Sequence, residues 1–235
     1  MTETDPHYVA YRMVFERVRA LATDPSAATR LDRPVPSCPE WTARQVVAHL
    51  AGLSEDWVAG HLDDYGTKSW AGAQVKRFTD QNIDTVLSAW ERAMDAFGEL
   101  THSPRGGTPG MWGFGDAVVH EADIRPVLAP DTRVPAEATA LGLKAGVARW
   151  REHLKTAEVP ALGIADHGGR IRWIGTDADP DAVQVITDDY DLFRAMFGRR
   201  SRAQIEAWEW SGNPSPYLDA GLPFPFRWNP EVVED

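Results

Sequence analysis

The sequence predicts an α+β protein in which a helical bundle of residues 1–155 precedes a small α+β domain of residues 156–235. Apolar residues recur three to four positions apart through most of the first part, which is the spacing of amphipathic helices. After about residue 156, short apolar runs alternate with glycine-containing turns, which is typical of short strands. The composition, 43% hydrophobic and 25% charged, is that of an ordinary globular protein.

The first two helices are predicted from their caps. Asp5 and Pro6 form a capping residue followed by proline at the first helical position. A proline-rich connection at residues 33–39 follows, and Thr42 is expected to cap the second helix. The apolar positions of these two helices are Tyr11, Val14, Phe15, Val18 and Leu21, and then Val46, Leu50, Leu53 and Trp57.

Three more helices are expected before the boundary. One begins near residue 79 and one covers about residues 136–154. Between them, a helix over residues 111–125 follows a glycine-rich loop and is expected to end or kink at Pro126.

The second part is expected to combine strands with short helices. Its predicted elements are a hairpin of residues 162–165 and 171–174, a strand at residues 182–186, a helix from Asp188 to Phe197 stopped by Gly198, and a short helix opened by a capping box at residues 201–204.

Charge and composition exclude several classes of partner. The net charge of −11 opposes binding to a nucleic acid or an anionic membrane. No apolar run approaches the roughly 18 residues of a membrane span, and the N-terminus has no secretory signal pattern. Cys38 is the single cysteine, so an intramolecular disulfide is impossible. We therefore expect a cytoplasmic protein.

Two histidines and one aspartate carry the strongest chemical signal. His49 lies on the apolar side of the second helix, and Asp116 and His120 are four residues apart on one face of the fourth. Ionisable groups directed into a bundle core are costly unless they are paired or coordinated. Two imidazoles and a carboxylate are a typical ligand set for a catalytic zinc ion with one open position. A hydrogen-bonded core histidine and a local ion pair are the alternatives.

A second carboxylate is expected to support His120. A metal-bound imidazole usually donates its other N–H group to an acceptor. Asp123 or Glu121 could be the acceptor for His120. The alternative is that the carboxylate is only a surface charge. Glu121 is also an alternative to Asp116 as ligand, although it is turned about 100° from His120 on the helix.

Three blocks resemble the mycothiol-dependent maleylpyruvate isomerase family, within the wider DinB-like metalloproteins. Residues 38–52 fit Cys-Pro-x-Trp-Thr-x-Arg-x-Val-x-x-His-Leu-Ala-Gly, and Asp116-x3-His120-x2-Asp123 resembles the family's Glu-x3-His-x2-Asp block. Gly198-Arg199 resembles an element of the family's C-terminal domain, which is similar to sterol carrier proteins.

The resemblance implies a DinB-like four-helix bundle with a divalent metal, typically zinc, held by His49, Asp116 and His120. It also implies mycothiol as the thiol cofactor or cosubstrate, and Arg199 as a group that binds this thiol or an anionic substrate. Aspartate stands here where the family usually has glutamate, which leaves the identity of the metal and the exact reaction open.

The chemistry implied is addition of a metal-activated thiol to an electrophilic small molecule. If the thiolate leaves and the trans product is released, the protein is an isomerase. If the thiol adduct itself is released, the protein is an S-transferase. The sequence does not distinguish the two reactions. Glycines at residues 106–115 suit either a lid or simply a flexible connection, and Trp112 in that segment could stack against bound cofactor or substrate. Cys38 is expected to be a structural turn residue.

Two other classes of function remain open at the level of sequence. A hydrolase would use the same ligands with metal-bound water and a carboxylate such as Asp123 as general base. A non-enzymatic binding or regulatory protein would have a closed four-ligand site or no metal. Neither the substrate nor the oligomeric state follows from the sequence.

Overall fold

The computed structural model describes residues 6–99, 109–174 and 182–233, with the side chains of residues 109–112 left out of that description. The chain divides into two compact units, with the boundary between Val134 and Pro135. The predicted α+β class is confirmed: helices make up most of the first unit, and a small sheet with helices makes up the second. No helix of the described residues is long and apolar enough to cross a membrane.

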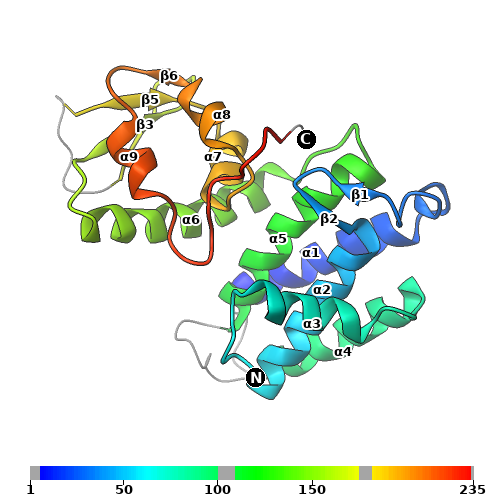
Figure 1. Ribbon diagram of the computed structural model, residues 1–235. Coiled ribbons are helices and arrows are strands. Elements are labelled where there is room, and N and C mark those ends of the chain that lie inside the picture. Colours follow the sequence, from blue (N-terminus) through cyan, green and yellow to red (C-terminus); the bar gives the residue numbers. More distant parts are fainter. Residues whose placement is uncertain (1–5, 100–108, 175–181, 234–235) are drawn as a thin grey trace. The chain divides into compact units, whose positions relative to one another are not determined.

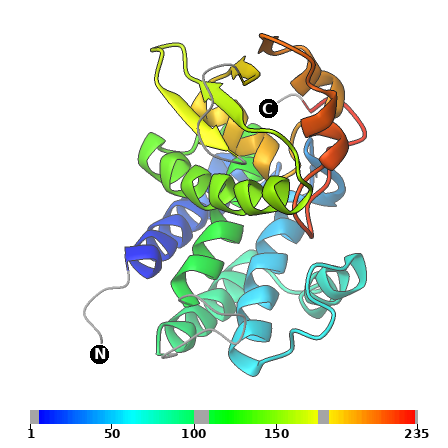
Figure 2. The ribbon, with the colours of Figure 1, turned by 90° about the vertical axis from the view of Figure 1, so that its left-hand side faces the viewer.

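Four helices of the first unit form a closed ring, the predicted four-helix bundle. They are α1 (Pro6–Thr23), α2 (Ala43–Ala59), α4 (Ile83–Gly98) and α5 (Pro109–Leu128). α1 packs on α5, α5 on α2, α2 on α4, and α4 on α1. α5 thus contacts both α1 and α2, which are labelled in Figure 1, and in Figure 2 the green α5 lies between the blue α1 and the cyan α2.

α2 begins where the sequence predicts. The side chain of Thr42 accepts a hydrogen bond from the backbone N–H of Gln45, and the side chain of Gln45 accepts one from the backbone N–H of Thr42. This capping box satisfies two helix-end donors that would otherwise lack partners. The first turn of α2 is thereby held in place ahead of His49.

The sequence missed a hairpin and a helix in this unit. The proline-rich connection at residues 33–39 contains β1 (Pro34–Val35) and the start of β2 (Cys38–Thr42), which pair antiparallel. α3 (Lys68–Arg77) packs on α2. It has no apolar stripe, and Gln74 is its only buried residue, so helical periodicity could not reveal it.

The ends of two helices also differ from expectation. α4 begins at Ile83, after Asn82, whose side chain accepts from the backbone N–H of Thr85 at 2.8 Å. Pro126 does not end α5, which continues to Leu128. A proline so close to the C-terminus removes only one late hydrogen bond, and the next turn closes through Ala129 N–H to the Arg125 carbonyl at 2.8 Å.

The second unit contains a four-stranded sheet in the order β4-β3-β5-β6. The predicted hairpin is confirmed as β3 (Leu162–Ala165) and β4 (Ile171–Ile174), paired in register from Leu162 with Ile174. β5 (Gln184–Ile186) lies parallel to β3, and the unpredicted β6 (Glu209–Trp210) pairs antiparallel with β5.

The helices of this unit are α6, α7, α8 and α9. α7 is capped by Asp188 and α8 by the predicted box of Ser201 and Gln204. The short α9 was not predicted. Their bounds are α6 (Ala136–Thr156), α7 (Asp189–Met196), α8 (Arg202–Glu206) and α9 (Ser215–Ala220).

α6 lies in the second unit, whereas the boundary expected near residue 156 placed it with the bundle. Its contacts explain the difference, because α6 packs on α7 and on β4. Figure 1 shows it running along one side of this unit. An amphipathic helix next to a boundary shows an apolar face in the sequence, but not which unit that face covers.

Gly198 stops α7 as expected, and its role is specific to glycine. Its φ is +74°, a left-handed conformation that other residues adopt at a cost. A Cβ atom added there would lie 2.4 Å from the carbonyl oxygen of Arg227. The turn that presents Arg199 therefore requires glycine.

The hydroxyl of Tyr11 is buried and hydrogen bonded in the bundle core, and its ionisation at high pH affects stability. The Tyr11 hydroxyl lies 2.6 Å from Ser54 Oγ and accepts from Trp90 Nε1 at 2.7 Å. Ser54 Oγ donates to the Leu50 carbonyl, so Tyr11 donates to Ser54. Burial raises the pKa of Tyr11 to about 12.

We predict that the protein loses stability between pH 10 and pH 12 and that Tyr11→Phe reduces this loss. The unfolded chain ionises Tyr11 near pH 10, whereas the folded protein keeps it neutral to about pH 12. The contribution is therefore complete below pH 10 and disappears as pH rises to 12, on the order of 2–3 kcal/mol. Urea unfolding of both proteins at pH 9 and pH 11.5 measures it. Equal pH dependence in the two proteins would contradict the assignment.

Candidate metal centre

The packing of α2 against α5 brings three sequence-predicted residues together. His49 comes from α2, and Asp116 and His120 come from successive turns of α5. Asp116 Oδ2 lies 3.4 Å from His49 Nε2 and 3.8 Å from His120 Nε2. One ligand atom from each residue lies within 4.8 Å of the other two.

The two imidazole–carboxylate separations are near those expected in the donor set of a tetrahedral zinc ion. Donors about 2.0–2.1 Å from zinc lie about 3.3–3.4 Å from one another in that geometry. The two imidazole–carboxylate distances of 3.4 and 3.8 Å are close to this value. They are longer than ordinary N–H to oxygen hydrogen bonds, which are about 2.7–3.2 Å. Asp116, although one methylene shorter than glutamate, therefore reaches both imidazoles.

The two imidazoles are buried and the aspartate is partly exposed. The side chains of His49 and His120 are 6% and 8% exposed, whereas that of Asp116 is 30% exposed. Burial lowers the pKa of His120, although the charges of Asp116 and Asp123 oppose that shift. A lowered pKa favours the neutral imidazole, which is the form that binds a metal. Asp116 is the most exposed of the three residues, although its oxygen Oδ2, which lies between the imidazoles, is buried.

Asp123 lies behind His120. Its Oδ2 is 2.9 Å from His120 Nδ1, and its Oδ1 accepts a hydrogen bond of 2.7 Å from Ser37 Oγ. Asp123 is fully buried, so the alternative of a surface charge is wrong. Sequence reasoning missed Ser37 because its partner lies 86 residues away.

Glu121 faces the neighbouring helix α1 rather than α2. Its carboxylate accepts from Arg17 at 2.6 and 2.8 Å and from Arg125 at 2.6 and 3.1 Å. Both oxygens are committed to arginines, and the side chain is fully buried. Glu121 is therefore neither the alternative metal ligand nor the acceptor for His120. Glu121 follows His120 directly in the helix, and adjacent helical residues point about 100° apart. The side chain of Glu121 is therefore directed away from the imidazoles.

Trp41 lies beside both imidazoles and was assigned no role from the sequence. Its ring centroid is 5.0 Å from that of His49 and 6.5 Å from that of His120. The two imidazole centroids are 5.0 Å apart. Trp41 stands one residue before Thr42, which caps the helix that carries His49. This position in the sequence could have indicated that Trp41 lies near the site. The indole covers one side of the donor set.

Three further residues singled out in the sequence are Arg199, Trp112 and Cys38. Arg199 is in the second unit, where its guanidinium donates to the Phe197 carbonyl at 2.6 Å. Trp112 lies in the first turns of α5, and its side chain is outside the described part of the structure. Cys38 begins β2 and pairs in register with Val35, in agreement with a structural position. The roles predicted for Arg199 and Trp112 stay predictions.

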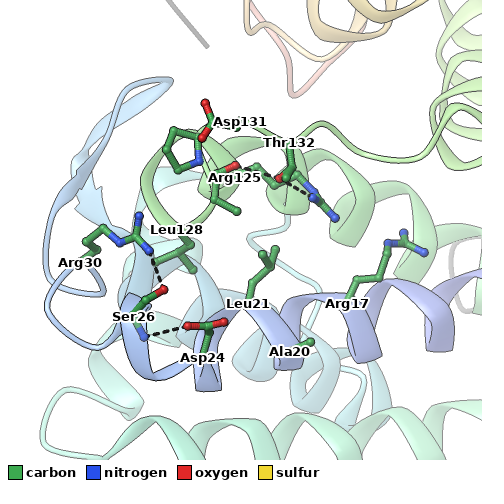
Figure 3. A pocket seen from close by; sticks show the side chains of 12 residues that line it. Arg17, Ala20, Leu21, Asp24, Ser26, Arg30, Arg125, Leu128, Asp131 and Thr132 are labelled. Carbon is green, nitrogen blue, oxygen red and sulfur yellow. Dashed lines mark hydrogen bonds between the residues drawn. The ribbon is translucent and has the colours of Figure 1, made fainter.

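A separate hollow of about 570 Å³ lies between the ends of α1 and α5, beside the short helix η1 (Pro25–Ala27). Figure 3 shows Arg17 from α1, Arg125 from α5 and Arg30 around it. None of the three candidate ligands lines it. Its three arginines are offset by the lining residues Asp24 and Asp131 and by Glu121, which binds two of them. This balance of charge gives the hollow no preference for an anion.

Comparisons with known proteins agree with this geometry. A family model described as the mycothiol maleylpyruvate isomerase N-terminal domain matches residues 11–153, which include both ligand helices and most of α6. Its end lies close to the domain boundary expected from the sequence, whereas the packing of α6 places that helix in the second unit. No curated protein matches the chain.

Two solved structures share the fold. They are crystal structures of the mycothiol-dependent maleylpyruvate isomerase and of its variant with one histidine replaced by alanine. Each has a TM-score of 0.58 and 14% sequence identity, over 94% of this chain and 95% of the other.

Proposed function

Because the chain belongs to the family of the mycothiol maleylpyruvate isomerase N-terminal domain, we propose that it is a metal-dependent isomerase. It would use a low-molecular-weight thiol, mycothiol, to convert the cis double bond of a maleylpyruvate-type substrate into the trans form. The observation that carries this proposal is the convergence of His49, Asp116 and His120, whose donor atoms lie within 4.8 Å of one another.

The residues of the site have different proposed roles. His49, Asp116 and His120 would hold a divalent metal, and zinc is the simplest choice for two nitrogens and one oxygen. A zinc ion held by these residues would supply Lewis acidity that lowers the pKa of a bound thiol toward neutral pH. Asp123 keeps His120 oriented, and Trp41 covers one side of the imidazoles. The partly exposed side of Asp116 is the side from which thiol and substrate would enter.

Substrate and product of this reaction are isomers, and the thiol is not consumed. The thiol gives up its proton, and its sulfur forms a bond to one carbon of the activated double bond; the π electron pair moves onto the conjugated carbonyl as an enolate, and the former double bond, now single, rotates. The carbon–sulfur bond then breaks, the double bond forms again in the trans geometry, and the thiol is regenerated. Arg199 is proposed to bind the anionic substrate or the thiol cofactor.

The arrangement of Asp123 weighs against the hydrolase alternative. A hydrolase needs a carboxylate free to take a proton from water. Asp123, the carboxylate considered for that task, is fully buried and bound by Ser37 and His120. Within the described residues, the cluster offers three donors rather than the closed set of four expected of a structural metal site.

The experiment that tests this function measures maleylpyruvate isomerisation with and without mycothiol. Protein stripped by a chelator and reloaded with zinc is compared with the stripped protein. We expect turnover only when thiol and metal are both present, with the trans product formed and the thiol recovered. A stable thiol adduct would identify an S-transferase instead. Ester or amide hydrolysis without thiol would favour the hydrolase.

A further inference from the structure

Ser37 completes a buried chain of contacts that ends at His120. Its hydroxyl donates to Asp123 Oδ1 at 2.7 Å, and Asp123 Oδ2 lies 2.9 Å from His120 Nδ1. Ser37, Asp123 and His120 are 9%, 0% and 6% exposed. A carboxylate with so little access to water depends on such partners, because burying an unpaired charge is costly.

The position of Ser37 lets it act on the site from outside the ligand helices. It lies in the connection between β1 and β2. β1 packs on α5, and β2 carries Trp41 and leads through Thr42 into α2. The hydroxyl of Ser37 thus joins the hairpin to the helix that carries Asp116 and His120.

We propose that Ser37 is a positioning residue for His120: it fixes the carboxylate of Asp123, which in turn fixes the imidazole. With Nδ1 facing Asp123 at 2.9 Å, Nε2 is the nitrogen that faces Asp116 at 3.8 Å. Partners of a ligating imidazole typically contribute 10–100-fold to metal affinity. This inference rests on the proposed function, because it assigns Ser37 to the same metal centre.

Zinc affinity, measured by competition with a chromogenic chelator, tests the proposal without reference to activity. Ser37→Ala is expected to bind zinc roughly 10-fold more weakly than wild type, and Ser37→Thr, which keeps the hydroxyl, to stay close to wild type. Because Ser37 acts through Asp123, adding Ser37→Ala to Asp123→Asn is expected to cause little further loss. Such non-additivity separates positioning from a general structural effect.

Ser54→Ala is the matched control. Ser54 is a buried serine of the same unit, and its hydroxyl is hydrogen bonded to Tyr11 and to the Leu50 carbonyl. Its loss is expected to lower stability without changing zinc affinity. Wild-type affinity in Ser37→Ala, or an equal loss with and without Asp123→Asn, would overturn the role of Ser37 alone. Wild-type protein that binds no zinc would overturn the proposed function and this inference with it.

Discussion

Replacing either His49 or His120 by alanine is expected to remove zinc from the purified protein and to abolish thiol-dependent isomerisation. Each variant deletes one of three donors and leaves only two protein ligands. Since loss of a residue behind a ligand already costs 10–100-fold in affinity, loss of the ligand itself should cost at least about 100-fold. Metal analysis after dialysis and assays with mycothiol measure the two effects.

His61→Ala is the control for this pair. His61 lies in the same unit, but its side chain is 75% exposed, and its nearest carboxylate is that of Asp56, at 4.0 Å. It should keep wild-type zinc content and activity. Full zinc occupancy in both His49→Ala and His120→Ala would place the metal elsewhere and remove the proposed chemistry.

Glu121→Ala is expected to destabilise the first unit by about 3–5 kcal/mol, the usual effect of removing one partner from a buried ion pair. Glu121 is fully buried and binds both Arg17 from α1 and Arg125 from its own helix. Without it, the largely buried guanidinium of Arg125 loses its carboxylate. Chemical denaturation followed by circular dichroism measures the change. Glu121→Gln, which keeps the shape, extends the test if the alanine variant does not fold.

The control for this effect is Glu40→Ala, which breaks the ion pair with Lys68. Both side chains of that pair are largely exposed, and exposed pairs contribute little to stability. Its free energy of unfolding should stay near that of wild type. If Glu121→Ala changes stability no more than Glu40→Ala, the three-residue cluster does not hold α1 against α5.

The sequence could identify the candidate ligands because their signals are local. Asp116 and His120 are one helical turn apart, and His49 lies on the apolar side of a helix with a recognisable cap. Both helices were expected in one bundle, and the packing of α2 against α5 brings the donors together. The direction of Glu121, about 100° from His120, also agrees with the helical geometry that disfavoured it as a ligand.

What the sequence did not reveal depends on contacts between distant segments. Ser37 meets Asp123 across 86 residues, and no spacing rule connects them. α3 is held by polar contacts: Gln74 donates to Asp56 at 2.7 Å, and Arg77 donates to the same carboxylate at 2.7 Å. Such a helix has no apolar periodicity to detect.

The most direct test of the metal centre is anomalous diffraction at the zinc absorption edge from crystals of protein purified without chelator. We expect one strong peak about 2.0–2.1 Å from His49 Nε2, His120 Nε2 and an oxygen of Asp116. Crystals soaked in zinc that show no peak between these residues, or show it only at another site, would contradict the account.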